Sequence, residues 1–292
     1  MKRKIVSVLI IGTIVVATVT GCSTANAKTS EPETKDGVTV VHAVGNTNYY
    51  PLVFLGDDNE LTGYAVDVNN AVDELLEEYT WEYEASSGDA ILMGTEQGLY
   101  EEAIGGFYYT PERAEKFIFP TYNGGSFAGL VVTDAHDDVR DLSVAAQQKL
   151  KIAPTYAGGG LIAFLKDYNE KNPDNQVEYE TIDERTDFDI TQDVISGRYD
   201  YDLQNLHAYN KVVLDNPELG EKTNFYSFAA IKSFDLFNKD QQELAERYSW
   251  AIQQLKEDGT LQELYVKWFG EDIFPVVDAA DESEYGIIYV NQ

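Results

Sequence analysis

Residues Gly105 to Arg113 read Gly-Gly-Phe-Tyr-Tyr-Thr-Pro-Glu-Arg, and this segment has the features of a helix start. Thr110 is a preferred N-cap residue, Pro111 suits the first helical position because its missing N–H has no partner there, and Glu112 is an acid near the positive end of the helix. The segment therefore predicts a helix that begins at Pro111 and carries Arg113 in its first turn.

Strand-like and helix-like runs alternate on both sides of this segment. Runs rich in β-branched residues or with alternating polarity predict strands, and apolar residues three or four apart predict helices. The alternation predicts an α/β fold with parallel pairs of strands. The predicted strands are 38–44, 52–55, 81–85, 127–132, 150–153, 177–181, 199–203 and 234–237, and the predicted helices are 63–79, 161–169, 189–196, 241–257 and 261–269.

The composition excludes several functional classes. The 292 residues include 51 acids and 21 Lys and Arg, a formal net charge of -30, whereas a nucleic-acid binder needs a basic face. This charge also disfavours direct adsorption to an anionic lipid surface. Hydrophobic residues make up 43% of the chain, too many for a disordered acidic protein, and the length suits two lobes or one domain with a large insertion.

Cysteine and histidine are scarce. The single cysteine excludes a disulfide framework and a Cys-rich zinc site. His42, His136 and His207 lie far apart in the sequence, which disfavours a His-based metal centre. We expect no metal and no cofactor.

The first 37 residues have the pattern of a secretion signal followed by a flexible linker. Lys2-Arg3-Lys4 precedes an apolar run, 5–19, that is too short for a spanning helix of about 20 residues but fits a secretory signal. Val19-Thr20-Gly21-Cys22 resembles a bacterial lipobox, and the alternative is a plain signal peptide with a stray cysteine. The lipobox implies that 1–21 is a lipoprotein signal peptide and that Cys22 is lipidated. Residues 22–37 are then a flexible tether.

Four parts of the chain together resemble one known family. They are 48–54 with 61–68 (NYYPLVF and LTGYAVDV), 105–113 (GGFYYTPER), 195–200 (ISGRYD), and 258–260 with 267–270 (DGT and KWFG). In this order they resemble the extracellular solute-binding proteins of amino-acid ABC importers, family 3. The resemblance covers about residues 38–270, nearly all of the chain beyond the tether.

The resemblance implies an α/β, two-lobed, periplasmic-binding-protein-like (type II) fold with two hinge crossovers. The crossings are expected near 122–127 and 228–236. Two crossings permit the lobes to close on a solute without separating. The implied parts are lobe 1 (38–124 and 235–274), lobe 2 (125–234) and a C-terminal tail (275–292) that could add a strand.

Arg113 matches the arginine that grips the α-carboxylate of an amino acid in this family. A guanidinium offers two parallel hydrogen bonds to a carboxylate, and the free amides of a helix start add to the attraction. The alternative is a surface arginine paired with Glu112 or Glu115.

Other positions in lobe 1 are implied by the same match. Gly106 and Tyr108 lie where the family offers a carbonyl and a hydroxyl to the ligand, although a shorter Thr or Ser usually stands in place of Tyr108. Tyr49 matches the aromatic residue that stacks on the ligand, and its alternative is a core position. Asn46 falls where many members have Asp.

In lobe 2, Thr155, Gly158 and Gly159 match a loop that approaches the ligand before a helix. Asn205 stands where most members have the Asp that pairs with the α-ammonium. Asn keeps an acceptor but has no charge. Either another acid substitutes, with Asp202, Asp67 and Asp89 as candidates, or the ligand lacks an ammonium group.

These features predict a lipid-anchored solute-binding component of an ABC importer, a monomer on the extracytoplasmic face of the cell membrane. Its partners would be a polar amino acid or close analogue, the membrane permease, and the membrane through Cys22, but no nucleic acid. The 20 tyrosines also fit a larger solute such as cystine or a short peptide. The alternatives are a sensory or adhesive lipoprotein, or a dehydratase or lyase that uses Glu101, Glu102 or Asp89.

Overall fold

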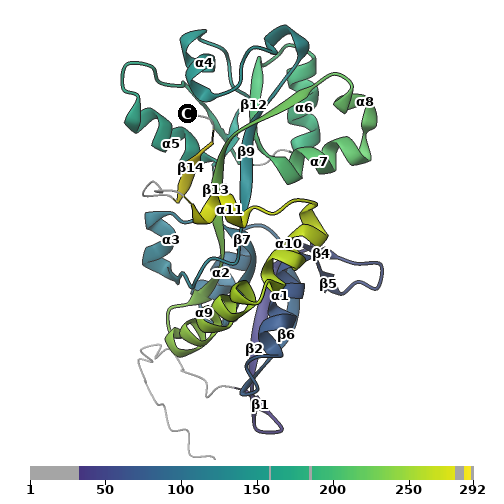
Figure 1. Ribbon diagram of the computed structural model, residues 1–292, viewed down its shortest axis with the longest axis vertical. Coiled ribbons are helices and arrows are strands. Elements are labelled where there is room, and N and C mark those ends of the chain that lie inside the picture. The colour runs from purple at the N-terminus through teal and green to yellow at the C-terminus, as the bar shows by residue number, and fades with distance from the viewer. Residues whose placement is uncertain (1–32, 158, 184–185, 280–285, 291–292) are drawn as a thin grey trace, which may run out of the picture. The chain divides into compact units, whose positions relative to one another are not determined.

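A computed structural model describes residues 33–157, 159–183, 186–279 and 286–290 (Figure 1). Cys22, the predicted signal peptide and most of the predicted tether lie outside these ranges. Residues 33–37 do not: β1 (Thr34–Lys35) pairs antiparallel with the next strand, so ordered structure begins within the segment assigned to the tether. None of the described helices is long and apolar enough to cross a bilayer.

Lobe 1 is built on parallel strands, as the alternating pattern predicts. The β-branched run at 38–44 forms β2 (Val38–Asn46). It pairs in parallel with β6 (Tyr79–Ser86) and β7 (Glu102–Phe107). A separate small sheet joins β3 (Asn48–Tyr49), β4 (Val53–Leu55) and β5 (Leu61–Thr62).

One long strand joins the two lobes. β13 (Asn224–Asn238) pairs antiparallel with β9 (Gly124–Val132) in its first part and with β7 and β8 (Phe117–Ile118) in its second. β12 (Tyr201–Asn205) continues the sheet beyond β9 in lobe 2. The sequence predicts only 234–237 as strand, because a strand covered on both faces lacks the alternating polarity that marks a half-exposed one.

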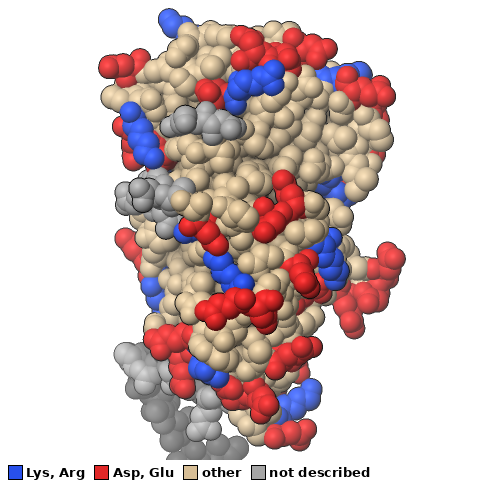
Figure 2. Space-filling view, viewed as in Figure 1, with Lys and Arg blue, Asp and Glu red and all other residues tan. Residues whose placement is uncertain are grey.

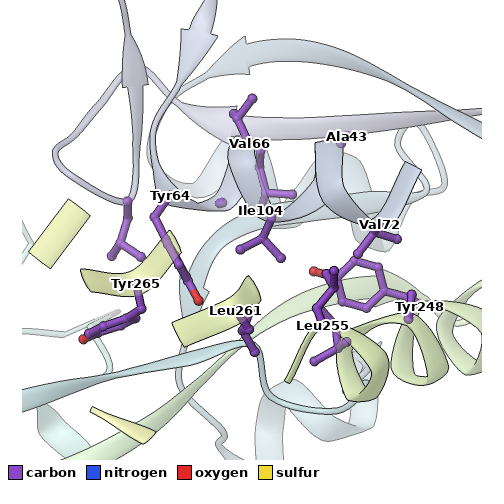
Figure 3. Close-up of a cluster of buried hydrophobic side chains, with 14 of the residues drawn as sticks. Ala43, Tyr64, Val66, Val72, Ile104, Tyr248, Leu255, Leu261 and Tyr265 are labelled. Atoms are coloured by element: carbon purple, nitrogen blue, oxygen red, sulfur yellow. The ribbon is translucent and has the colours of Figure 1, made fainter. Parts of the chain in front are cut away.

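Two buried clusters form the cores of the lobes. In lobe 1, α1 (Tyr64–Asp73), α9 (Gln242–Glu257) and α10 (Thr260–Phe269) pack against the sheet. Figure 3 shows Tyr64 pointing toward Tyr265, and the two ring centroids are 5.3 Å apart. In lobe 2, β9 and β12 pack against helices on the upper side of Figure 1.

The remaining helices cover the lobes. They are α2 (Asp89–Glu96), α3 (Pro111–Lys116), the short 3-10 helix η1 (Asp134–His136), α4 (Leu142–Gln147), α5 (Ile162–Lys171), α6 (Asp187–Ile195), α7 (Leu206–Asp215) and α8 (Pro217–Gly220). The helix predicted at 63–79 ends early, at Asp73, because the chain turns after the buried Leu76 to enter β6.

Two predicted strands in lobe 2 are mostly wrong. Within 150–153, only Ile152 makes an isolated bridge, to Tyr201. Of 177–181, only the last residue belongs to a strand, β11 (Thr181–Ile182), which pairs with β10 (Thr155–Tyr156). Ile152 and Val177 are nonetheless buried, so apolar runs that enter a core resemble strands even where no ladder forms.

The C-terminal tail contacts both lobes. α11 (Phe274–Asp278) begins at the last residue assigned to lobe 1 and places Val277 of the tail in the lobe 1 core. β14 (Ile287–Tyr289) adds the extra strand by pairing antiparallel with β13 at 229–231, and Ile287 enters the lobe 2 core. The Tyr289 hydroxyl donates to Asp167 Oδ2 at 2.8 Å. The tail therefore lies along the crossing between the lobes.

Candidate functional site

A cavity of about 330 Å³ lies between the lobes and gathers most of the expected ligand residues. Gly158 lies outside the described residues. The expected residues that line the cavity are Asn46, Tyr49, Gly106, Tyr108, Arg113, Thr155, Gly159 and Asn205.

Arg113 is held at the start of α3, as the sequence predicts. Thr110 is the N-cap, and its hydroxyl accepts from the Arg113 N–H at 3.1 Å. The guanidinium donates to the Tyr108 carbonyl at 2.9 Å and lies 5.5 Å from the Phe107 ring centroid. Both Glu112 and Glu115 are described, and neither forms an ion pair with Arg113. Burial lowers the pKa of Arg113, but the group stays charged at neutral pH.

Tyr108 lines the cavity and also packs into the core of lobe 2. Its hydroxyl donates to Asn205 Oδ1 at 2.8 Å, and the two residues are 5% and 6% exposed. Its ring packs on Gly160, where an added Cβ would lie 2.0 Å from a ring carbon. Tyr108 of lobe 1 therefore makes an inter-lobe contact with Asn205 of lobe 2.

Tyr49 borders the same groups from lobe 1. Its ring meets that of His207 edge-on, with centroids 5.5 Å apart. Burial and then the charge of Asp187 raise the pKa of Tyr49 to about 12, while Arg113 and a hydrogen bond with Asn205 oppose the rise. The phenol thus lies within electrostatic reach of both a cation and an acid.

Two backbone features shape the wall of lobe 1. Gly106 has φ +71, in the left-handed region that favours glycine, and a Cβ there would lie 3.0 Å from Leu52. The neighbouring Gly105 N–H donates to the buried Asp235 at 3.0 Å. Asn46 lines the cavity, but its side-chain oxygen accepts from the Asn48 N–H at 2.8 Å and so stabilises a local turn.

The acids proposed from the sequence to supply the charge that Asn205 lacks do not all reach the cavity. Asp67 accepts from Lys267 at 2.6 Å and Trp268 at 2.7 Å, away from the cavity. Asp202 is buried in β12 and does not line the cavity. Asp89 does line it, and Tyr156 lines the same cavity.

Sequence reasoning missed Asp187, which also lines the cavity. It is the first residue of α6, after the N-cap Thr186. The signal is the one that located Arg113: an N-cap Thr followed by charged residues in the first helical turn. The residue is exposed as a whole, yet partial burial of its carboxylate raises the pKa of Asp187.

A second hollow of about 480 Å³ adjoins the cavity and shares Asp89, Leu92, Arg113 and Gly159 with it. Lys116 and Lys166 also line this hollow. No group of His, Cys, Asp or Glu within the described ranges is arranged to hold a metal ion. The arrangement can therefore bind a charged organic solute through one cation and one or more acids.

Comparison of the sequence with known proteins identifies the family to which the chain belongs. The model of the bacterial extracellular solute-binding proteins, family 3, matches residues 41–271. The L-cystine-binding protein TcyK of Bacillus subtilis is 26% identical, covering 93% of this chain and 98% of that protein. The L-cystine-binding protein TcyJ of the same species is 27% identical, covering 86% and 90%.

Solved structures show the same fold. The probable amino-acid ABC transporter extracellular-binding protein ytmK of Bacillus subtilis aligns with a TM-score of 0.66 at 22% identity, covering 80% of this chain and 99% of that one. A structure from work on glutathione import via GshT and the cystine importer TcyBC of Streptococcus mutans aligns with a TM-score of 0.66 at 20% identity, covering 80% and 96%. The two-lobed, type II periplasmic-binding-protein-like fold is thus confirmed.

Proposed function

Because the chain belongs to the bacterial extracellular solute-binding proteins, family 3, we propose that it is the solute-binding component of an ABC importer. It captures an amino acid or close analogue between its lobes and presents it to a membrane permease. It acts as a monomer on the extracytoplasmic face, attached to the cell membrane through a lipid on Cys22. The lipobox-like Val19-Thr20-Gly21-Cys22 supports this attachment.

The observation that carries the proposal is the position of Arg113 in the inter-lobe cavity. Its guanidinium is fixed by the Tyr108 carbonyl and by the start of α3, and it faces a space bounded by both lobes. Pre-positioned guanidinium groups bind carboxylates through two parallel hydrogen bonds. A carboxylate-bearing solute that enters this space would contact both lobes at once.

The size of the space favours a solute larger than a single short amino acid. The cavity of about 330 Å³ continues past Arg113 into the hollow of about 480 Å³. The two relatives named above are L-cystine-binding proteins. We therefore propose cystine or a short peptide as the solute class.

The acids considered for catalysis are poorly placed for it, which supports binding without turnover. Glu101 accepts from the His42 N–H at 2.9 Å, outside the cavity. Glu102 is fully buried in the lobe 1 core, where it accepts from Asn69 and Trp81. Of these three acids, only Asp89 borders the cavity. A general acid–base must reach the reacting group, so Glu101 and Glu102 cannot act on a solute held there.

Thermal unfolding of the full chain in detergent, with and without solute, tests the proposal. A solute that binds only the native cavity raises the melting temperature by mass action. L-cystine, the common amino acids and short peptides form the panel. We expect Arg113→Ala to abolish the shift and Arg198→Ala, an exposed arginine outside the cavity, to preserve it. A full shift in Arg113→Ala, or a response only to solutes without a carboxylate, would contradict the proposal.

A further inference from the structure

The cavity carries a second charge opposite Arg113. Its charged lining residues, within the described ranges, are Arg113 and Asp89 from lobe 1 and Asp187 from lobe 2. We propose that Asp187 binds the ammonium group of the solute, an inference that rests on the proposed function. The solute class is then a zwitterion whose carboxylate is held by lobe 1 and whose ammonium is held by lobe 2.

The start of α6 leaves the Asp187 carboxylate available. Thr186 and Asp189 form two hydrogen bonds with each other. The Thr186 hydroxyl accepts from the Asp189 N–H at 3.1 Å and donates to Asp189 Oδ2 at 2.6 Å. Asp187 takes no part in this capping pair, and its carboxylate has no hydrogen bond or ion pair with any other described residue. It lies on the cavity wall, where a solute can supply the partner.

Two other polar groups on the cavity wall are less suited to hold the ammonium group. Asp89 comes from lobe 1, as Arg113 does, so it would not join the solute to lobe 2. Asn205 is uncharged, and its side-chain oxygen accepts from Tyr108 at 2.8 Å. An ammonium group carries three donors and binds most strongly to an ionised acceptor. Asp187 is the described acid that lobe 2 contributes to the cavity wall, whereas Arg113 comes from lobe 1.

Asp187 and Arg113 also act on a common neighbour. The Tyr49 phenol is influenced by both charges, Asp187 raising its pKa and Arg113 lowering it. Both charged groups therefore act on one hydroxyl, and all three residues line the cavity. A solute with two opposite charges can engage both, and each charge comes from a different lobe.

Calorimetric titration of the full chain in detergent with a matched pair of probes tests the assignment. L-cystine carries the ammonium groups, and dithiodipropionate is the same disulfide-linked diacid without them. The variants are Asp187→Asn and the control Asp189→Asn, which removes an equal charge from the same helical turn but does not line the cavity. A thermal melt of each variant without solute checks the fold.

We expect Asp187→Asn to weaken L-cystine binding about ten- to hundred-fold, as for loss of a charge-assisted hydrogen bond, and to leave dithiodipropionate binding within about three-fold. Asp189→Asn should change neither. The role of Asp187 would be overturned if Asp187→Asn lost affinity equally for both probes or lost none for L-cystine. It would also be overturned if the wild-type protein bound both probes equally. Wild-type protein that binds neither probe would overturn the proposed solute class itself, which is a separate outcome.

Discussion

The contact between Tyr108 and Gly160 shows how one side chain can set the fit of the lobes. Tyr108 directly follows β7 of the lobe 1 sheet but belongs to the lobe 2 core. Its ring occupies the space that a side chain at Gly160 would need. The absence of a Cβ at Gly160 is therefore a requirement of packing.

Substitution of that glycine tests this fit. We expect Gly160→Ala to lower the free energy of unfolding by about 1–3 kcal/mol through overpacking, measured by chemical denaturation. In a Tyr108→Ala background, Gly160→Ala should cost much less, because the clashing ring is gone. Additive effects of the two changes would show that the ring and the glycine do not compete for the same space.

At the scale of elements, β14 supplies structure that the matched family segment, which ends at residue 271, does not include. It extends the sheet along β13 where that strand passes between the lobes. Ile287 is 1% exposed and Ile288 4%. Since adjacent residues of a strand point to opposite faces, the two side chains enter different cores.

Truncation of one of these side chains tests the contribution of the tail. We expect Ile287→Ala to reduce the free energy of unfolding by about 2–5 kcal/mol, the usual cost of a buried isoleucine, in a urea titration. Leu214→Ala is the control, because Leu214 is 66% exposed and should cost less than about 0.5 kcal/mol. An equal, small effect at both sites would contradict a structural role for β14.

At the scale of the whole molecule, acidic side chains are spread over the visible face rather than gathered in one patch (Figure 2). With a formal net charge of -30, this distribution favours solubility. The lobes nevertheless meet through a neutral histidine. His207 from α7 packs against Tyr49 and Phe269 and contacts Ser126 Oγ at 3.2 Å.

The stability of the molecule should depend on pH through this histidine. Burial lowers the pKa of His207 from 6.5 to about 4. Between these values the unfolded chain binds a proton that the folded protein does not, so the free energy of unfolding falls as the pH falls. The loss reaches about 3 kcal/mol near pH 4. His207→Asn, compared with wild type in denaturation curves at pH 7 and pH 5, should remove this part of the acid sensitivity; an unchanged pH dependence would contradict it.

The sequence by itself determined the family and several local structures. The start of α3 follows from Thr110, Pro111 and Glu112, because capping depends on residues adjacent in the chain. β2 and α9 follow from β-branched runs and helical periodicity in the same way. The match of Arg113 to a family motif likewise needed only neighbouring residues.

Only the tertiary structure decided which residues, distant in the sequence, line the cavity together and contact one another. Asn205 accepts a hydrogen bond from Tyr108, which is 97 residues away in the chain. Asp187, which no spacing rule connects to Arg113, lines the same cavity. The full length of β13 was also not predicted, and its pairing with β9 and β7 was seen only in the structure. These features arise from contacts between segments far apart in the sequence. Local sequence patterns do not specify which of these segments the fold brings together.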